Sequence, residues 1–403
     1  MKIAFVEQVS KMGGVEYSTL RLAAELDRLG REVQIICPEE GDLSHMARAQ
    51  SLSVSIVPSP KFSSVSLLIG GKYLPNPLGI FTTFINVFKA AKTLEHHLNA
   101  NPVDVLVSKG LLSHLYTGLA AKRCQIPCVW YMQEEVDQKR ALGLFHMALI
   151  WGANRFPDKI IVDSPALLSQ FEKMERYPQA LTIIPNGIDP AQFRKFSAEE
   201  RKTARQNLGI PQNALVIGQS GRIIPLKGHK TTLTAFAELA RRETNLHLLF
   251  VGAPLFSNQS YANELKHQAQ QLGIGDRVVF SGFLPDVREG LAAMDIFVHA
   301  SIETDSPLGV LEAMACELPV VVSAVKGCVD MVVPGSSGLL FNPGDSEDLA
   351  NQLKLIINSP QQRASLGIAG RESILANYSN AVSAHNFLSK VEEIIVNQHT
   401  TRS

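Results

Sequence analysis

The 403-residue chain has no excess charge of either sign, because 38 Lys and Arg residues balance 38 Asp and Glu residues. Proteins that bind nucleic acids use a basic face to reach the phosphates, so this composition argues against a nucleic-acid partner. Any anionic ligand has to be met locally, by a few cations gathered in one place.

The chain also lacks long apolar runs and paired cysteine motifs. The opening MKIAFVEQ enters a strand pattern at once, and no segment has the length expected of a signal peptide or a membrane-spanning helix. The five cysteines are odd in number and lack zinc-ligand spacing, so we expect reduced thiols. These absences predict a cytoplasmic protein, either free or at the inner face of the membrane.

What the sequence does contain is a regular alternation of short apolar strands and amphipathic helices. Residues 2–8 have the pattern of a strand, residues 13–30 that of a turn and a helix, and residues 32–37 that of the next strand. Such units imply a parallel, doubly wound sheet. A second series starts at residue 214, and the chain length also favours two domains. The predicted fold class is α/β, with two Rossmann-like domains facing a central cleft.

The turn-forming pair Asn186 and Gly187 marks the expected end of the first domain. We therefore expect domains over residues 1–186 and 187–372, with C-terminal helices over 373–403 that pack back toward the first domain. In open α/β sheets, ligands bind beyond the carboxyl ends of the strands. Functional motifs should accordingly lie in the loops that lead from strands into helices.

The first such loop holds Gly13 and Gly14, which open the first helix. Backbone without side chains lets a phosphate approach amides at the positive end of the helix dipole, although a plain Gly-Gly turn is an equal alternative. The full GxGxxG fingerprint is absent. This absence argues against an NAD-dependent dehydrogenase.

The equivalent loop of the second domain is GRIIPLKG, residues 221–228, which carries Arg222 and Lys227. A guanidinium fork and an ammonium group together suit a diphosphate, and they can neutralise a leaving diphosphate without a magnesium ion. The alternative is an ordinary solvated loop. No aspartate cluster with divalent-metal spacing accompanies the two cations, so we expect neither a metal site nor a cofactor.

A third loop and helix lie in ETDSPLGVLEAMACELPVV, residues 303–321. The amides of Leu308, Gly309 and Val310 would be free at the start of this helix and could hold phosphate oxygens. Glu312, expected in about the first turn, could accept hydrogen bonds from ribose hydroxyls. Alternatively, the carboxylate of Glu312 would bind no ligand and would only interact favourably with the helix dipole.

Taken together, these segments resemble those of the family 4 glycosyltransferases, retaining enzymes of the GT-B architecture. The resemblance covers nearly the whole chain in family order, in the segments GGVEYSTLRLAAELDRLGREVQIIC, IIPNGIDPAQF, GRIIPLKGH, VVFSGFLPD, ETDSPLGVLEAMACELPVVVS and VVPGSSGLLFNPGDSEDLA. It implies an acceptor-side first domain and a second domain that binds a nucleoside-diphosphate sugar. The acceptor would be a sugar, a glycan or a lipid-linked molecule, as in polysaccharide, glycolipid or glycoconjugate synthesis.

The resemblance also implies roles for single residues. Gly14 would touch the donor phosphates, Arg222 and Lys227 would hold the diphosphate, and Glu312 would bind the ribose. The backbone around Phe283 and Leu284 would contact the base.

Two positions depart from the family pattern. Relatives usually have a glutamate eight residues before the position of Glu312, where this chain has Thr304 between Glu303 and Asp305. Either neighbouring carboxylate could substitute, or the sugar preference could differ. Relatives commonly have a histidine where this chain has Gln133, which Glu134 and Glu135 follow. Glutamine cannot act as a general base, but it can orient a sugar hydroxyl.

Residues 62–92 are apolar, with Lys72, Lys89 and Lys92 as the charged positions. One helical face combines Ile80, Phe84, Val87 and Phe88. A core helix explains most of this pattern, while weak peripheral contact with a membrane would suit a lipid-linked acceptor.

Three functions of different classes remain open from the sequence. The first is a hexosyltransferase, in which the acceptor hydroxyl attacks on the face that the diphosphate leaves. The second is a sugar-nucleotide epimerase or phosphorylase on the same scaffold. The third is a binder of sugar nucleotides without catalysis, for which Thr304 and Gln133 leave room.

Overall fold

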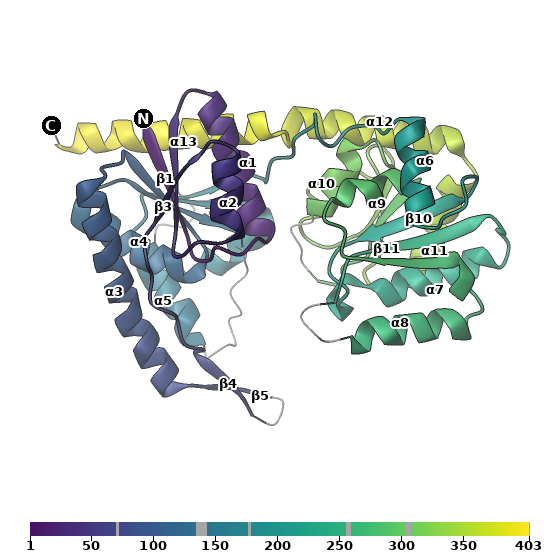
Figure 1. Ribbon diagram of the computed structural model, residues 1–403, viewed down its shortest axis with the longest axis horizontal. Helices are drawn as coiled ribbons and strands as arrows, with labels where there is room; N and C mark the ends of the chain where they lie inside the picture. The colour runs from purple at the N-terminus through teal and green to yellow at the C-terminus, as the bar shows by residue number, and fades with distance from the viewer. Residues whose placement is uncertain (70–71, 134–142, 176–178, 255–258, 304–307, 403) are drawn as a thin grey trace. The chain divides into compact units, whose positions relative to one another are not determined.

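The structure is a computed structural model that describes the chain except for residues 70–71, 134–142, 176–178, 255–258, 304–307 and 403. The chain forms two compact units, Met1–Gly187 with Asn380–Ser403, and Ile188–Ser379 (Figure 1). The second crossing between the units therefore lies at residues 379 and 380, beyond the expected limit at 372. That limit falls inside helix α12 (Pro360–Asn377), which belongs to the second unit.

The first unit contains a seven-stranded sheet in the order β3-β2-β1-β6-β7-β8-β9. All neighbouring strands are parallel. Strands such as β6 and β7 are buried along their whole length, which is typical of a sheet covered on both faces. The strands are β1 (Lys2–Glu7), β2 (Glu32–Cys37), β3 (Ser53–Ile56), β6 (Val105–Lys109), β7 (Cys128–Met132), β8 (Lys159–Val162) and β9 (Leu181–Ile183).

Helices cover both faces of this sheet. One face packs against α1, α2 and α13, where Phe387 of α13 stacks on Phe5 at 6.0 Å between ring centroids. The other face packs against α3, α4 and α5 around Trp130 and Leu94. The helices are α1 (Gly14–Arg28), α2 (Asp42–Ala49), α3 (Pro77–Ala100), α4 (Leu111–Cys124), α5 (Leu144–Ala153), α13 (Asn380–Arg402) and the 3₁₀ helix η2 (Pro165–Phe171).

Local signals account for the start of α3. The side chain of Asn76 accepts a hydrogen bond from the Gly79 amide at 3.1 Å, and Pro77 occupies the first helical position. Both features favour a helix start. An antiparallel hairpin of β4 (Ser66–Ile69) and β5 (Lys72–Pro75) precedes the helix. The sequence pattern did not predict this hairpin.

The second unit repeats the plan with a six-stranded sheet in the order β12-β11-β10-β13-β14-β15. Its neighbouring strands are again parallel. The strands are β10 (Leu215–Ser220), β11 (Leu246–Val251), β12 (Val278–Gly282), β13 (Ile296–His299), β14 (Val320–Ser323) and β15 (Leu339–Phe341).

Separate apolar clusters on the two faces of this sheet hold its helices. They are α6 (Ala198–Asn207), α7 (His229–Ala240), α8 (Ser260–Gln271), α9 (Val287–Ala293), α10 (Leu308–Ala315), α11 (Ser346–Ile357), α12 and the 3₁₀ turns η3 (Pro225–Lys227) and η4 (Gly275–Arg277). The prediction of two parallel, doubly wound α/β domains is confirmed. Among the described residues, no helix is both long enough and apolar enough to cross a bilayer.

Candidate functional site

The strand order reverses beside the first strand of each sheet, between β1 and β6 and between β10 and β13. Loops that leave neighbouring strands in opposite directions open a crevice at such a switch point, and ligands of α/β sheets bind there. We therefore expect the functional residues of each unit to lie near its switch point.

In the second unit, two glycines shape the loop after β10. Gly221 has φ of 139° and Gly228 has φ of 66°, values that side chains disfavour. A Cβ atom at Gly228 would also collide with the carbonyl oxygen of Ala300. The loop thus lies tightly against the segment that follows β13, and the amide of Ile302 donates to the carbonyl of Leu226 at 3.0 Å.

Gln219 of β10 holds this loop in place through its side chain. Its side chain is 2% exposed, and its Nε2 donates to the carbonyl oxygen of Lys227 at 2.7 Å. Its Oε1 accepts a hydrogen bond from Thr232 of α7 at 2.6 Å. The sequence analysis overlooked this residue, although a polar side chain inside the apolar strand ALVIGQS was a usable signal.

The two predicted cations lie on this anchored loop. Arg222 is exposed, and among the described residues its guanidinium has no hydrogen-bond or ion-pair partner. Lys227 is half-buried at the end of η3. The adjacent His229 is buried, and burial lowers its pKa to about 4, with the charge of Lys227 acting in the same direction. At neutral pH His229 is therefore uncharged, and the loop's positive charge resides on Arg222 and Lys227.

The start of α10 reaches the same place. An ideal Cβ at Gly309 would lie 3.0 Å from Oγ of Ser220, the last residue of β10. Leu308 and Gly309 are half-buried and Val310 is buried. The structure thus brings the first turn of α10 to the switch point beside the loop that carries Arg222.

Glu312 is the fifth residue of α10. It therefore lies just after the first turn, close to the position that the sequence predicted. It is 8% exposed. Its charge contributes, after burial, to raising the pKa of Cys316 to about 12. Glu303 is exposed, whereas Thr304 and Asp305 lie outside the described residues.

Phe283 and Leu284 follow β12. Phe283 is 74% exposed and Leu284 is half-buried. The amide of Gly252 donates to the carbonyl of Gly282 at 2.9 Å, which holds this turn against the end of β11. Their proposed contact with a base stays a prediction.

In the first unit, Gly13 is the N-cap of α1 and Gly14 its first residue, and both are exposed. The carboxylate of Glu16 already lies against this helix start, with hydrogen bonds to the backbone of Gly13 and of Glu16 itself. Burial raises the pKa of Glu16. A phosphate at this helix start would have to displace this carboxylate.

A buried lysine that the sequence analysis overlooked lies at the first switch point. Lys109 is the last residue of β6, fully buried, and paired in register with Glu7 of β1. Its Nζ donates to Oε1 of Gln133 at 2.6 Å and lies 3.8 Å from the ring centroid of Tyr131. Burial lowers the pKa of Lys109 to about 8, against the raising effect of Glu7, Asp163 and Glu16.

Gln133 extends this contact into a chain of polar side chains. Its Nε2 donates to Oγ of Ser18 at 2.8 Å and to Oδ1 of Asn186, whose Nδ2 donates to Asp163 at 2.9 Å. These hydrogen bonds link the ends of β6, β7 and β8 and fix the orientation of the Gln133 amide. Glu134 and Glu135 lie outside the described residues.

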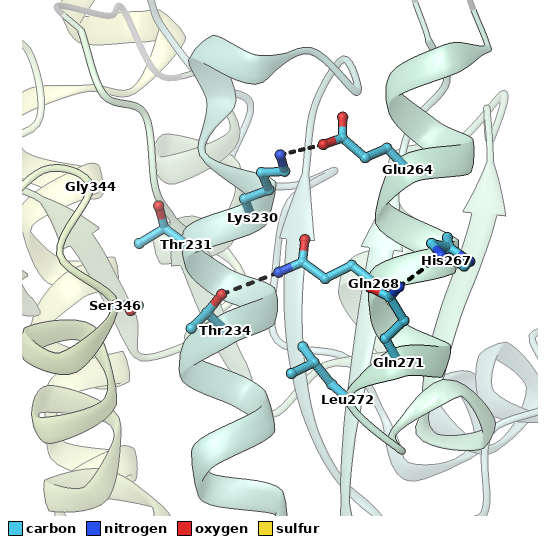
Figure 2. A pocket seen from close by; sticks show the side chains of 10 residues that line it. All are labelled: Lys230, Thr231, Thr234, Glu264, His267, Gln268, Gln271, Leu272, Gly344 and Ser346. Atoms are coloured by element: carbon cyan, nitrogen blue, oxygen red, sulfur yellow. Dashed lines mark hydrogen bonds and ion pairs between the residues drawn. The ribbon is translucent and has the colours of Figure 1, made fainter.

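A separate polar groove of about 730 Å³ lies between α7 and α8 (Figure 2). Its side chains bond mainly to one another: Lys230 with Glu264, Gln268 with Thr234, and Gln271 with His267. None of the predicted site residues lines it. For this reason we do not assign the groove to the site.

Metal ligands are not grouped in the part of the chain that the structure describes, where no three His, Cys, Asp or Glu side chains could share an ion. The expectation of a metal-free site stays a prediction, because Glu134 and Asp305 are outside that part.

Comparison with known proteins identifies the family. The model of the glycosyl transferases group 1 matches residues 200–373, and that of Glycosyltransferase Family 4 matches residues 12–192. A D-inositol 3-phosphate glycosyltransferase of Stackebrandtia nassauensis is 28% identical, over 93% of this chain and 86% of its own. A GDP-mannose-dependent monoacylated alpha-(1-6)-phosphatidylinositol monomannoside mannosyltransferase of Corynebacterium glutamicum is 29% identical, over 76% and 87%.

Solved structures show the same fold. Anabaena Alr3699/HepE in complex with UDP and glucose has a TM-score of 0.79 at 24% identity, covering 97% of this chain and 99% of that one. The sucrose-phosphate synthase of Thermosynechococcus elongatus has a TM-score of 0.76 at 20% identity, covering 98% and 100%. The chain belongs to the family 4, or group 1, glycosyltransferases, and it is an enzyme that transfers a sugar to an acceptor.

Proposed function

We propose that the enzyme moves a hexosyl group from a nucleoside-diphosphate sugar to an acceptor hydroxyl, with retention of configuration and without a metal ion. The observation that carries the proposal is the anchored loop after β10. It holds Arg222 exposed and unpaired among the described residues, beside the first turn of α10. Permanent cations and helix-start amides are the groups that stabilise a departing diphosphate.

This placement supports a displacement on one face of the donor sugar. The bond between the anomeric carbon and the diphosphate oxygen breaks, and the acceptor oxygen bonds to that carbon on the same face. The acceptor proton passes to the leaving phosphate oxygen, so no protein base is needed. Arg222 and Lys227 stabilise the charge that develops on the diphosphate, and Glu312 binds the ribose.

The names of the similar proteins suggest which substrates to try. GDP-mannose and UDP-glucose are the donors to test first, and inositol 3-phosphate is the first acceptor. We propose a polyol, sugar, glycan or lipid-linked acceptor and a role in glycoconjugate or polysaccharide synthesis in the cytoplasm.

The test combines donor screening with stereochemistry. Purified enzyme is incubated with GDP-mannose, UDP-glucose or ADP-glucose, with and without acceptor and with excess chelator, and the released diphosphate is measured. We expect one donor to be consumed in chelator, with the anomeric configuration retained by NMR. Inversion, or activity only with added Mg²⁺ or Mn²⁺, would contradict the mechanism.

The two alternatives give different products. Epimerised donor, or a sugar phosphate formed with phosphate, would indicate an epimerase or a phosphorylase. A donor that raises the melting temperature with concentration but is never consumed would indicate a binder without catalysis.

A further inference from the structure

An apolar trough of about 700 Å³ lies between α3, α4 and α5 of the first unit. Its floor is one face of α4, made by Leu112, Leu115 and Leu119. Its walls are the first half of α3 and most of α5. The volume is within the range of about 300–1,000 Å³ that is common for small-ligand sites.

The walls leave large apolar side chains in water. Phe84 of α3 is 62% exposed and Trp151 of α5 is 51% exposed, and both line the trough. Core packing accounts for the second half of α3, where Leu94 and Leu98 are buried. It does not account for Phe84 and Phe88, which are 62% and 42% exposed, so this part of the face is available to a ligand, whereas Val87 packs partly against the core.

The described charged side chains that line the trough all have the same sign. The charged side chains that line it, among the described residues, are Lys122 and Arg155. They lie at one end, since each precedes the start of one of the neighbouring strands β7 and β8. In the sequences of the three helices Glu95 is the one acidic residue, and Arg123 pairs with it at 3.1 Å.

An apolar floor that ends at cations matches an amphiphile with an anionic head. The floor from Leu112 to Lys122 spans roughly 15 Å at the rise of an α-helix. We propose that the trough binds a hydrocarbon chain of an anionic membrane phospholipid, with the phosphate of the head group held by Lys122 and Arg155. Apolar burial and attraction to anionic lipid together supply the two signals that peripheral binding requires.

The first test uses the full chain and vesicles of phosphatidylcholine with or without phosphatidylglycerol, in the absence of any sugar donor. We expect co-sedimentation with the anionic vesicles that weakens in high salt. Bromine atoms on the lipid chains should quench the fluorescence of the exposed Trp151, whereas Trp130 is fully buried. The substitution W151F should abolish the quenching, and quenching that persists would contradict the proposed position.

Two variants distinguish binding of a lipid hydrocarbon chain in the trough from non-specific adsorption to vesicles. Ala148 is exposed and lines the trough, so A148W fills it while adding apolar surface. We expect A148W to lose the quenching, because the lipid chain no longer fits. We expect K122E/R155E to weaken binding to anionic vesicles by roughly tenfold or more, while K202E on the exposed side of α6 leaves it unchanged.

Several results would overturn the proposal. They are equal binding to neutral vesicles, unchanged quenching in A148W, or no binding to either vesicle. A lipid-free dimer that A148W disrupts in sedimentation velocity would mean that a second copy of the chain covers the trough. None of these measurements uses sugar transfer, so their outcome is independent of the proposed reaction.

Discussion

At the scale of single residues, the candidate functional residues of the two units include exposed side chains that can reach a ligand and buried side chains that position others. Arg222 belongs to the first kind, and Gln219 and Lys109 belong to the second. Substitutions in the two groups should therefore have different consequences. The first should change turnover alone, and the second should change both stability and turnover.

Replacement of Arg222 by alanine should lower the rate of sugar transfer by about 100-fold or more, as expected for loss of one charge-stabilising group. The melting temperature should stay within error, because the exposed side chain has no partner among the described residues. Initial rates and thermal melts check both points. The matched control is R242A, an exposed arginine of the same unit; a normal rate in R222A would exclude the proposed role.

Lys109 makes stability depend on pH in a defined direction. Burial lowers its pKa to about 8, below the usual 10.5, so between these values the unfolded chain binds the proton and the folded chain does not. The contribution of Lys109 to the free energy of unfolding should therefore rise from pH 8 to pH 10. Denaturant titrations should show that the free energy of unfolding of wild type, minus that of K109M, increases over this range.

The matched control for that titration is K173M, since Lys173 is exposed in the same unit. Its difference from wild type gives the baseline for replacing a solvent-exposed lysine of this unit by methionine. A difference for K109M that is flat, or that shrinks as the pH rises, would mean that Lys109 keeps its charge in the folded state.

At the scale of elements, the glycines decide how close the loops of the second unit approach. Gly228 and Gly209 both have positive φ, 66° and 68°, but a Cβ at Gly209 meets no atom within 4 Å. At Gly228 it collides with the carbonyl of Ala300, at the end of β13. Both positions favour glycine because of their backbone conformation. Gly228 alone of the two also excludes a side chain because of a steric clash.

The substitution G209A should cost about 1–2 kcal/mol of unfolding free energy, the strain of a left-handed alanine. G228A should cost clearly more, because the loop must also move, and it should lower turnover by displacing Arg222 and Lys227. Denaturant unfolding and initial rates of both variants test this. Equal costs in the two variants would show that the contact with Ala300 is unimportant.

The sequence predicted most elements correctly but missed four strands. The strand patterns of residues 2–8 and 32–37 correspond to β1 and β2, and the helix pattern within residues 13–30 corresponds to α1. The hairpin of β4 and β5 and the short strands β9 and β15 were not predicted. Strands of three or four residues give too few positions for a period to be recognised, so only their pairing partners identify them.

At the scale of the whole molecule, the last helix of the chain belongs to the first unit and not to the second. Helix α13 returns to the first unit, where Phe387 is fully buried against Phe5 and Tyr131. The first unit therefore depends on both ends of the chain. Its stability should be sensitive to substitution of Phe387, which lies 200 residues beyond Gly187, where the main segment ends.

Phe387→Ala should destabilise the first unit by about 3–5 kcal/mol, as for other buried aromatic side chains. Hydrogen exchange should accelerate in β1 and β7 and stay unchanged in β10 and β11, because α13 packs in the first unit alone. The control L375A changes a half-exposed residue of α12 and should leave both sheets protected. Faster exchange in both units would mean that they unfold together.

The sequence by itself determined the two α/β domains, the loops after the strands and the motif GRIIPLKG with its two cations. These features depend on periodicity and turn chemistry, which act between residues close together in the chain. Only the tertiary structure decided that Lys109, Gln133, Asn186 and Asp163 form one hydrogen-bonded chain and that Gln219 anchors the cationic loop. Strand order brings these residues together, and strand order is set by long-range packing that no local pattern records.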